Sequence, residues 1–339
     1  MLDSNKILEV KNLKTFFYTD AGVVKAVDGV SFDLKFGETL GIVGETGSGK
    51  SVTALSILRL IQQPPGKIVD GEILFDGKDL LKINKGELQN YRGNRISMIF
   101  QDPMTSLNPV YTIGNQIMES ITIHRKLNKK DIIKESLKLL EMVEIPEPMK
   151  RLNSYPHEFS GGMRQRVMIA MAIANSPSIL IADEPTTALD VTIQAQILEL
   201  MDSVKIKTNS SIIIITHDLG VVAKYASRVM VMYAGKPVEF STVNNIFYSP
   251  LHPYTMGLME SITRLDEEKK EKLKSIKGSP PSLIDLPEGC IFRVRCKYAM
   301  DKCRKKYPPL IEVIKGHKAA CYSAGEFLKG NQKKVLIKK

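Results

Sequence analysis

Short apolar runs separated by turns dominate the first 240 residues of the chain and predict strands that alternate with helices. The runs that predict strands are 7–36, read as an antiparallel meander, 39–43, 71–83 with a turn at Asp76-Gly77, 95–100, 179–183 and 211–216. Amphipathic runs predict helices over 51–61, 113–144, 160–175 and 192–205, and residues 221–240 predict a further helix and a closing hairpin. Runs such as 212–215 have the length of buried parallel strands. The pattern predicts an α/β fold with an antiparallel β subdomain and an inserted helical subdomain.

A glycine-rich segment lies between the strand predicted at 39–43 and the helix that follows it. Its residues are Gly44, Glu45, Thr46, Gly47, Ser48, Gly49, Lys50 and Ser51. Glycines let the backbone approach a ligand, so that successive N–H groups and the start of the helix form an anion-binding concavity. Lys50 would contact the β- and γ-phosphates, and the Ser51 hydroxyl would bind Mg²⁺. The segment predicts a phosphate-binding loop; a glycine turn without a ligand is the alternative.

Two carboxylates follow another predicted strand. Asp183 and Glu184 end the run 179–184, and ligand sites of α/β proteins lie at the carboxyl ends of strands. We expect Asp183 to anchor the Mg²⁺ shell and Glu184 to polarise an attacking water. His217 ends the next predicted strand, where it could contact a γ-phosphate; otherwise it is an ordinary polar loop residue.

A second anion-binding feature is predicted at residues 159–163. Ser160 is a natural N-cap, and Gly161-Gly162 leave the first N–H groups of the following helix sterically open. A capped core helix is the alternative. Phe17 and Tyr18 lie one hairpin upstream of the phosphate loop, where an aromatic ring could stack on a purine. Taken alone, they are sheet-packing aromatics.

These segments together resemble the nucleotide-binding subunit of ATP-binding cassette (ABC) transporters, whose core is a P-loop NTPase fold. The matching motifs are Walker A at 44–51, a Q-loop glutamine at Gln101, the signature motif at 159–163, Walker B at 179–184, a D-loop at 187–190 that includes Asp190, and the switch histidine His217. The resemblance implies that Gln101 senses Mg²⁺, that an aromatic at Phe17 or Tyr18 stacks on adenine, and that two such chains sandwich ATP head to tail. The signature reads Phe-Ser-Gly-Gly-Met where the common form is Leu-Ser-Gly-Gly-Gln, so Met163 lacks the amide of the usual glutamine.

Composition adds limits on the class of protein. Apolar residues make up 43% and charged residues 25% of the 339 positions, as in soluble globular proteins. The beginning of the sequence has no apolar stretch typical of a secretory signal, and no run approaches the length of a membrane span. The net charge of +11 arises in residues 264–339, which carry 20 Lys and Arg against 9 Asp and Glu. We interpret this charge as a solubilising surface.

The C-terminal part contains all the cysteines, Cys290, Cys296, Cys303 and Cys321. Four thiolates suit zinc or an iron–sulfur cluster, and the spacing alone chooses neither. Segments 247–255, 278–283 and 289–296 resemble the appendage of oligopeptide and dipeptide importer ATPases, and segment 159–170 resembles the first of their two paralogous subunits. This resemblance implies a [4Fe-4S] cluster on the four cysteines. Zn²⁺, with His317 replacing one thiolate, is the runner-up, and no metal is the third option.

The sequence therefore predicts an ABC ATPase of a peptide importer. We expect an ATP-binding domain over 1–245, with its helical subdomain at about 87–165, and a C-terminal extension over 246–339. The expected partners are a paralogous ATPase or a second copy of this chain, two transmembrane permease subunits and, indirectly, an extracytoplasmic peptide-binding protein. No nucleic acid is expected, and the chain should lie peripherally on the cytoplasmic side of the membrane. The rival hypotheses are a nickel importer of the same branch, a soluble ABC ATPase acting on DNA or the ribosome, and a metal-sensing or redox module built on the cysteines.

Overall fold

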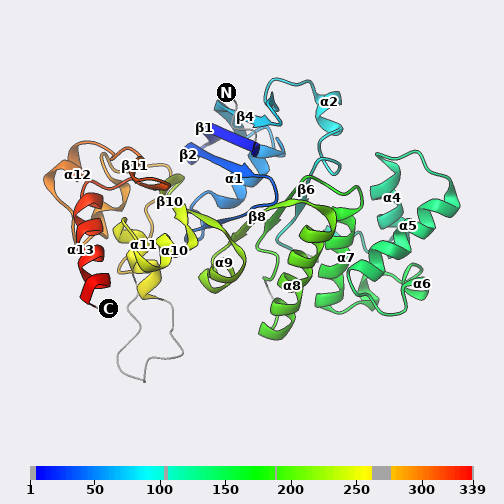
Figure 1. Cartoon of the computed structure of the whole chain (residues 1–339). Coiled ribbons are helices and arrows are strands. Elements are labelled where there is room, and N and C mark those ends of the chain that lie inside the picture. The colour runs from blue at the N-terminus through cyan, green and yellow to red at the C-terminus, as the bar shows by residue number, and fades with distance from the viewer. Residues whose placement is uncertain (1–4, 103–105, 188, 262–275, 338–339) are drawn as a thin grey trace. The chain divides into compact units, whose positions relative to one another are not determined.

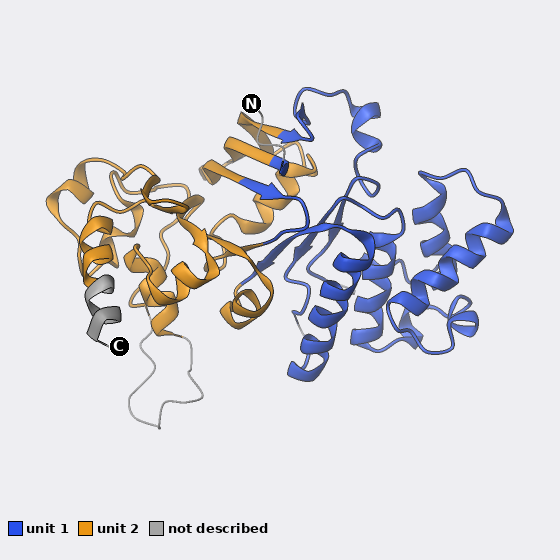
Figure 2. Cartoon of the chain, in the orientation of Figure 1, with its two compact units in different colours: residues 1–8, 33–39, 74–216 blue, residues 9–32, 40–73, 217–339 orange. Residues whose placement is uncertain are grey.

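A computed structural model describes residues 5–102, 106–187, 189–261 and 276–337 (Figure 1). The chain divides into two compact units, which are coloured separately in Figure 2. Unit 1 comprises residues 1–8, 33–39 and 74–216, and unit 2 comprises residues 9–32, 40–73 and 217–339. The predicted domain boundary at residue 245 falls within unit 2 and inside a short helix, Val243–Tyr248. The predicted division into domains stays a prediction.

Strands and helices alternate along most of the chain. The strands are β1 Lys6–Thr19, β2 Gly22–Lys35, β3 Thr39–Val43, β4 Gly66–Phe75, β5 Lys78–Asp79, β6 Ile96–Ile99, β7 Ile179–Asp183, β8 Ser211–Thr216, β9 Arg228–Tyr233, β10 Lys236–Thr242, β11 Ile311–Ile314 and β12 His317–Ala319. The α-helices are α1 Lys50–Ile57, α2 Lys85–Gln89, α4 Ile113–Thr122, α5 Lys129–Met142, α6 Pro148–Arg151, α7 Gly161–Ile173, α8 Val191–Thr208, α9 Leu219–Tyr225, α10 Val243–Tyr248, α11 Pro253–Glu260, α12 Asp301–Lys305 and α13 Ala324–Ile337. Two 3₁₀ helices are η1 Pro156–Glu158 and η2 Ile291–Val294.

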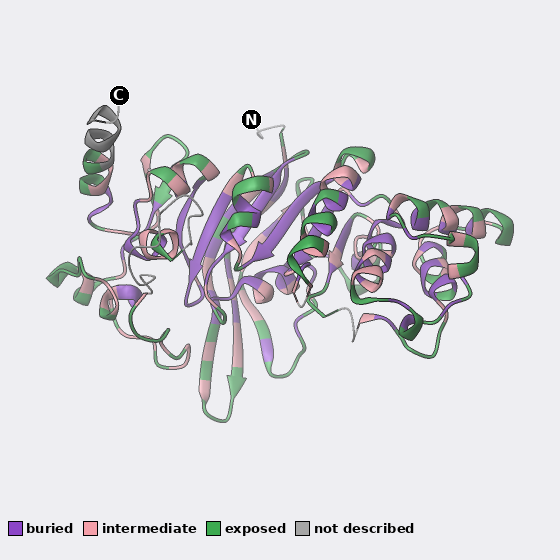
Figure 3. Ribbon diagram, turned by 90° about the horizontal axis from the view of Figure 1, so that it is seen from below, coloured by how far each residue is buried: buried purple, intermediate pink, exposed green. Residues whose placement is uncertain are grey.

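Unit 1 is built on parallel strands and a helical part. β7 pairs in parallel with β6 and with β8, and every residue of β7 and β8 is buried, as a parallel sheet requires (Figure 3). Helix α7 packs against β6, α8, α4 and α5. The predicted inserted helical segment is therefore present as the separate helices α4, α5 and α6.

Unit 2 joins the phosphate-loop strand to the C-terminal extension. β3 pairs in parallel with β9, β9 pairs antiparallel with β10, and β10 pairs antiparallel with β12. An apolar cluster buries Tyr233 and Val231 of the core strands together with Tyr254 and Phe292 of the extension. The extension thus adds strands and core residues to the unit that contains the phosphate loop.

The structure refines the bounds of three predicted segments. The segment 7–36, predicted as several short strands with turns, is two long strands, because a strand with one solvated face tolerates polar residues. The helical stretch predicted over 113–144 consists of two helices, since Asn128 caps a new one and its side chain accepts a bond from the Asp131 N–H. Helix α1 ends at Ile57 instead of Ile61, because Arg59 adopts a left-handed conformation with φ of 53°.

A buried carboxylate fixes the extension to the core strands. Glu239 of β10 is fully buried, and its oxygens accept hydrogen bonds from the backbone N–H groups of Leu251 at 2.7 Å and His252 at 3.0 Å. Its Oε1 also lies 2.7 Å from Nε2 of the buried His317 in β12. One side chain therefore satisfies three groups of the extension that would otherwise be buried without partners.

We expect the Glu239→Ala substitution to lower the free energy of unfolding by about 3 kcal/mol, because it leaves three buried polar groups without their acceptor. Glu239→Gln, which keeps the shape, should cost less. Urea unfolding followed by circular dichroism measures both effects, with Glu326→Ala at an exposed position of α13 as the control. A wild-type unfolding midpoint for Glu239→Ala would contradict this role.

Candidate nucleotide-binding site

The phosphate loop links β3 to α1 within unit 2. Gly49 is the N-cap of α1 and has φ of 96°, a conformation that side chains rarely adopt. A Cβ on Gly49 would collide with the carbonyl oxygen of Ala26, and a Cβ on Gly44 would collide with that of Met232. The Oγ of Ser48 is buried and has no hydrogen-bond partner in the described part of the chain. A tightly enclosed loop that presents an unsatisfied hydroxyl fits a phosphate ligand.

Lys50 lies against the loop that precedes it. Its Nζ donates to the carbonyl oxygens of Gly44 at 2.8 Å and Glu45 at 3.1 Å, and the residue is 5% exposed. The positive charge is therefore held over the loop, where the β- and γ-phosphates of a nucleotide would bind. Ser51 follows as the second residue of α1 and is half-buried, and its role as a Mg²⁺ ligand stays a prediction.

His217 and the phosphate loop line one cavity of about 330 Å³ in unit 2. Gly44, Glu45 and His217 contribute to its wall, and so do residues of the extension, Leu258, Ser261 and Ile276. The sequence predicted that His217 and this loop contact the same phosphate, and the structure brings them to one cavity. The contribution of the extension to this wall was not predicted.

The extension also bonds directly to the loop. The Tyr254 hydroxyl accepts a hydrogen bond of 2.8 Å from the Glu45 N–H. The guanidinium of Arg295 donates to both carboxylate oxygens of Glu45, at 2.7 and 3.0 Å, and the pKa of Arg295 is raised by this carboxylate. Sequence reasoning missed both residues, because they lie 209 and 250 positions from Glu45 and belong to no nucleotide-binding motif.

The acid pair lies at the carboxyl end of β7 in unit 1. Asp183 is 4% exposed, and Glu184 has a positive φ of 45°, so the chain turns sharply where the strand ends. Gln101 Nε2 donates to Glu184 Oε2 at 3.1 Å, and the Thr187 hydroxyl donates to the same oxygen at 3.0 Å. The structure therefore brings together the predicted Q-loop glutamine and the predicted catalytic carboxylate, with Thr187 as a further partner.

The helix predicted after Ser160 is α7, also in unit 1. Ser160 is its N-cap, and the Ser160 Oγ accepts from the Met163 N–H at 3.3 Å. Ser160 and Gly161 are exposed, so the N-terminus of this 13-residue helix is open. Gly162 has a packing role that the sequence did not reveal, because a Cβ there would lie 2.8 Å from Ile193 Cγ2.

The structure also shows the surroundings of three further predicted site residues, Asp190, Phe17 and Tyr18. Asp190 caps α8, and its Oδ1 accepts from the Ile193 N–H at 2.9 Å. Its neighbour Ala188 in the predicted D-loop lies outside the described residues. Tyr18 is 52% exposed on β1, whereas the half-buried Phe17 packs beside Gly66. Tyr18 is thus the more accessible of the two aromatics predicted to stack on adenine.

The cysteines gather around one small cavity of about 20 Å³. The lining cysteines are Cys290, Cys296, Cys303 and Cys321. Burial raises the pKa of the Cys290 thiol to about 11 and that of Cys321 to about 12. Among the described residues, no group of three or more His, Cys, Asp or Glu side chains is placed to hold a metal ion. His317 does not line this cavity, because its ring contacts Glu239 instead.

Comparison with known proteins identifies the family. The ABC transporter family matches residues 27–187, and the C-terminal region of oligopeptide/dipeptide transporters matches residues 238–303. The oligopeptide transport ATP-binding protein OppD of Bacillus subtilis is 56% identical over 317 residues, which cover 94% of this chain and 88% of OppD. This chain belongs to the ATP-binding subunits of oligopeptide and dipeptide ABC transporters. The family predicted from the sequence motifs is confirmed.

Other relatives of this ABC ATPase agree in name and in fold. The dipeptide transport ATP-binding protein DppD of B. subtilis is 54% identical, with 94% of each chain covered. A dimeric ATP-binding cassette in a post-hydrolysis state with ADP and Pi matches with a TM-score of 0.63 and 27% identity, over 70% of this chain and 98% of that one. The cbiO1 subunit of a Clostridium perfringens ABC transporter matches with a TM-score of 0.61 and 28% identity, over 72% and 91%. The predicted ABC ATPase fold is confirmed.

No helix within the described ranges of this ABC ATPase is sufficiently long and apolar to span a bilayer.

The contact between Gln101 and Glu184 leads to a test of the catalytic assignment. In the assembled transporter we expect Glu184→Gln to lower the rate of phosphate release at least about 100-fold, because an amide cannot accept the proton of the attacking water. ATP binding should persist. The matched control is Glu199→Gln, an exposed carboxylate on α8. An unchanged rate of hydrolysis would refute the role of Glu184.

Proposed function

We propose that this ABC ATPase energises the import of di- and oligopeptides as the peripheral, cytoplasmic subunit of a membrane transporter. The C-terminal extension supports this cargo class, because residues 238–303 match the C-terminal region of oligopeptide/dipeptide transporters. The named relatives are peptide transport proteins along nearly the whole chain. ATP hydrolysis would supply the energy for transport, because the lysine of the phosphate loop and the N-terminus of the following helix suit the phosphates of ATP.

The residues divide the work of hydrolysis by their chemistry. Lys50 neutralises charge on the β- and γ-phosphates, while Glu184 orients the water that attacks the γ-phosphorus and accepts its proton. Ser51 and Asp183 offer the oxygen ligands that Mg²⁺ prefers, and the ion, when bound, supplies charge neutralisation. Gln101, bonded to Glu184 at 3.1 Å, couples the acid pair to the helical part of unit 1.

A second ATPase chain is part of the proposal. The N-terminus of α7 is exposed, and its capped first turn offers N–H groups to a phosphate. The matching ATP-binding cassette is a dimer in its solved structure. We therefore assign Ser160, Gly161 and Gly162 to a nucleotide held by a partner chain, either a paralogue or a second copy.

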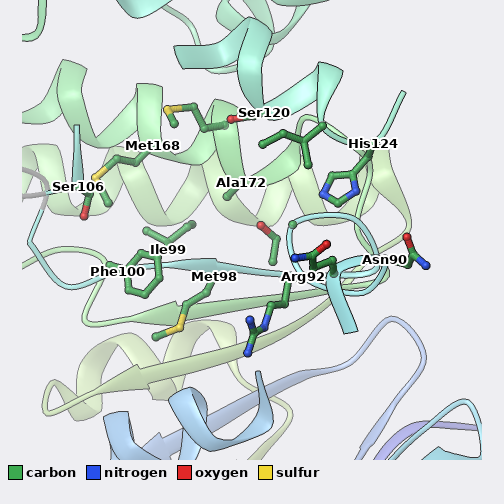
Figure 4. Close-up of a pocket in the computed structure, with 15 residues that line it drawn as sticks. Asn90, Arg92, Met98, Ile99, Phe100, Ser106, Ser120, His124, Met168 and Ala172 are labelled. Carbon is green, nitrogen blue, oxygen red and sulfur yellow. The ribbon is translucent and has the colours of Figure 1, made fainter. Parts of the chain in front are cut away.

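We assign the docking of a permease to a cavity in unit 1 (Figure 4). Its volume is about 640 Å³, and Met98, Phe100, Met168 and Ile123 give it apolar walls. The Phe100 and Ile123 side chains are 43% and 66% exposed, although both are apolar. Phe100 directly precedes Gln101, so a permease segment seated here would act on the residue that bonds Glu184.

Reconstitution tests the transport function. The chain is assembled in proteoliposomes with a paralogous ATPase, two permease subunits and a peptide-binding protein of an oligopeptide transporter. We expect ATP-dependent uptake of a labelled tripeptide, and Ile123→Asp should abolish uptake by placing a charge in the docking cavity. Lys126→Asp, an exposed neighbour outside that cavity, is the control. Uptake of nickel without peptide, or ATP hydrolysis that needs no permease, would contradict the proposal.

We further propose that the four cysteines bind a [4Fe-4S] cluster. Four thiols around one cavity match the donor set of such a cluster. Each cysteine binds a different iron, so the sulfur atoms need not converge on one point, whereas tetrahedral zinc requires convergence. Four cysteine thiolates are the donor set of such a cluster, and zinc is the alternative that the experiment below separates from it.

Anaerobic purification tests the cluster. We expect about four iron atoms and four acid-labile sulfides per chain, because the cluster is formed from equal numbers of both. The Cys303→Ser variant should lose most of this iron, whereas Ser323→Ala, a serine on the same cavity, should keep it. Zinc without sulfide would rule the cluster out.

A further inference from the structure

Glu45 is held by the C-terminal extension through two of its groups. Its N–H donates to the Tyr254 hydroxyl, and its carboxylate receives both arms of the Arg295 guanidinium. The Arg295 side chain is 5% exposed and the Glu45 side chain 25% exposed, so this pair is shielded from most solvent. A paired guanidinium and carboxylate in two parallel bonds fixes direction as well as distance.

Arg295 is itself oriented before it reaches the loop. Its Nε donates to the Lys277 carbonyl at 3.0 Å, and its Nη2 donates to the Ile276 carbonyl at 3.3 Å. The guanidinium carbon lies 5.8 Å from the centre of the Tyr233 ring. These contacts orient the guanidinium group of Arg295 toward the carboxylate of Glu45.

Glu45 also forms hydrogen bonds with the groups that are expected to bind phosphate. Its carbonyl oxygen accepts from Lys50 Nζ at 3.1 Å and from the Ser48 N–H at 3.1 Å. A shift of Glu45 therefore moves an acceptor of the lysine that contacts the phosphates. Ile276, whose carbonyl orients Arg295, also lines the cavity shared by the loop and His217.

We propose that Arg295 is a positioning residue for the nucleotide, which sets the affinity for ATP by holding Glu45 and, through its carbonyl, Lys50. This inference rests on the ATPase function proposed above. It makes the C-terminal extension part of the ATP site, beyond its role as a feature of the peptide-transporter branch. Arg295 directly precedes Cys296, so the same loop that lines the cysteine cavity carries the residue that holds the phosphate loop.

The test separates the Michaelis constant for ATP from the turnover number in the assembled transporter. We expect Arg295→Met to raise KM for ATP about tenfold, which corresponds to about 1.4 kcal/mol, with kcat changed less than about twofold. Arg295→Lys should recover part of the loss, because an ammonium keeps the charge but cannot make the paired bonds. The control is Arg304→Met, an exposed arginine of α12 in the same extension.

A double substitution keeps the proposal falsifiable if Arg295→Met weakens the fold. Glu45→Gln should raise KM by a similar factor, and the double variant should be no worse than either single one, because both remove the same interaction. A lower melting temperature with unchanged KM would mean that Arg295 only stabilises the extension, and additive effects would mean that the pair does not act as a unit. Either result overturns the inference. A wild-type complex that hydrolyses no ATP would instead overturn the proposed function.

Discussion

A glycine-rich loop binds phosphate only when its backbone is held open, and in this protein Glu45 makes the bonds that hold it. Its N–H, carbonyl and carboxylate each contact a different group, Tyr254, Lys50 and Arg295. Glycines give the loop the freedom to fold around an anion, and this freedom carries an entropic cost that contacts from outside the loop must offset. The proposed role of Lys50 depends on that balance, because its ammonium group would reach the phosphates only while the loop keeps its shape.

Two carboxylates connect the extension to the core of unit 2 by different means. Glu45 lines a cavity and forms an ion pair with the guanidinium group of Arg295. Glu239 is fully buried and forms hydrogen bonds with Leu251, His252 and His317. Between them lies an apolar cluster in which Tyr233, Tyr254 and Phe292 pack together. The extension therefore shares one core with the phosphate-loop strand. This is why a boundary at residue 245, placed by composition and motif, falls inside a compact unit.

Local chemistry was readable from the sequence wherever the groups that interact are close along the chain. The cap at Ser160 bonds the N–H group three residues away, so the residue type alone predicted where α7 begins. Asp190 caps α8 in the same way, although the sequence analysis assigned it only to the D-loop. The turn at Asp76-Gly77 was likewise predicted, and β4 and β5 pair across it through Phe75 and Lys78. The long strands β1 and β2 were divided into short pieces, because their polar residues lie on a solvated face that periodicity cannot distinguish from turns.

The sequence by itself determined the class of the protein, because the phosphate loop, the acid pair and the signature helix are each encoded in a few adjacent residues. It also predicted that Gln101 and Glu184 serve one reaction, and they lie in hydrogen-bond contact. Only the tertiary structure decided what holds the loop, since Tyr254 and Arg295 are 209 and 250 residues from Glu45. The residues that surround an arginine or a tyrosine in the sequence do not indicate its bonding partner. The bonds that define its role form only when distant segments pack together.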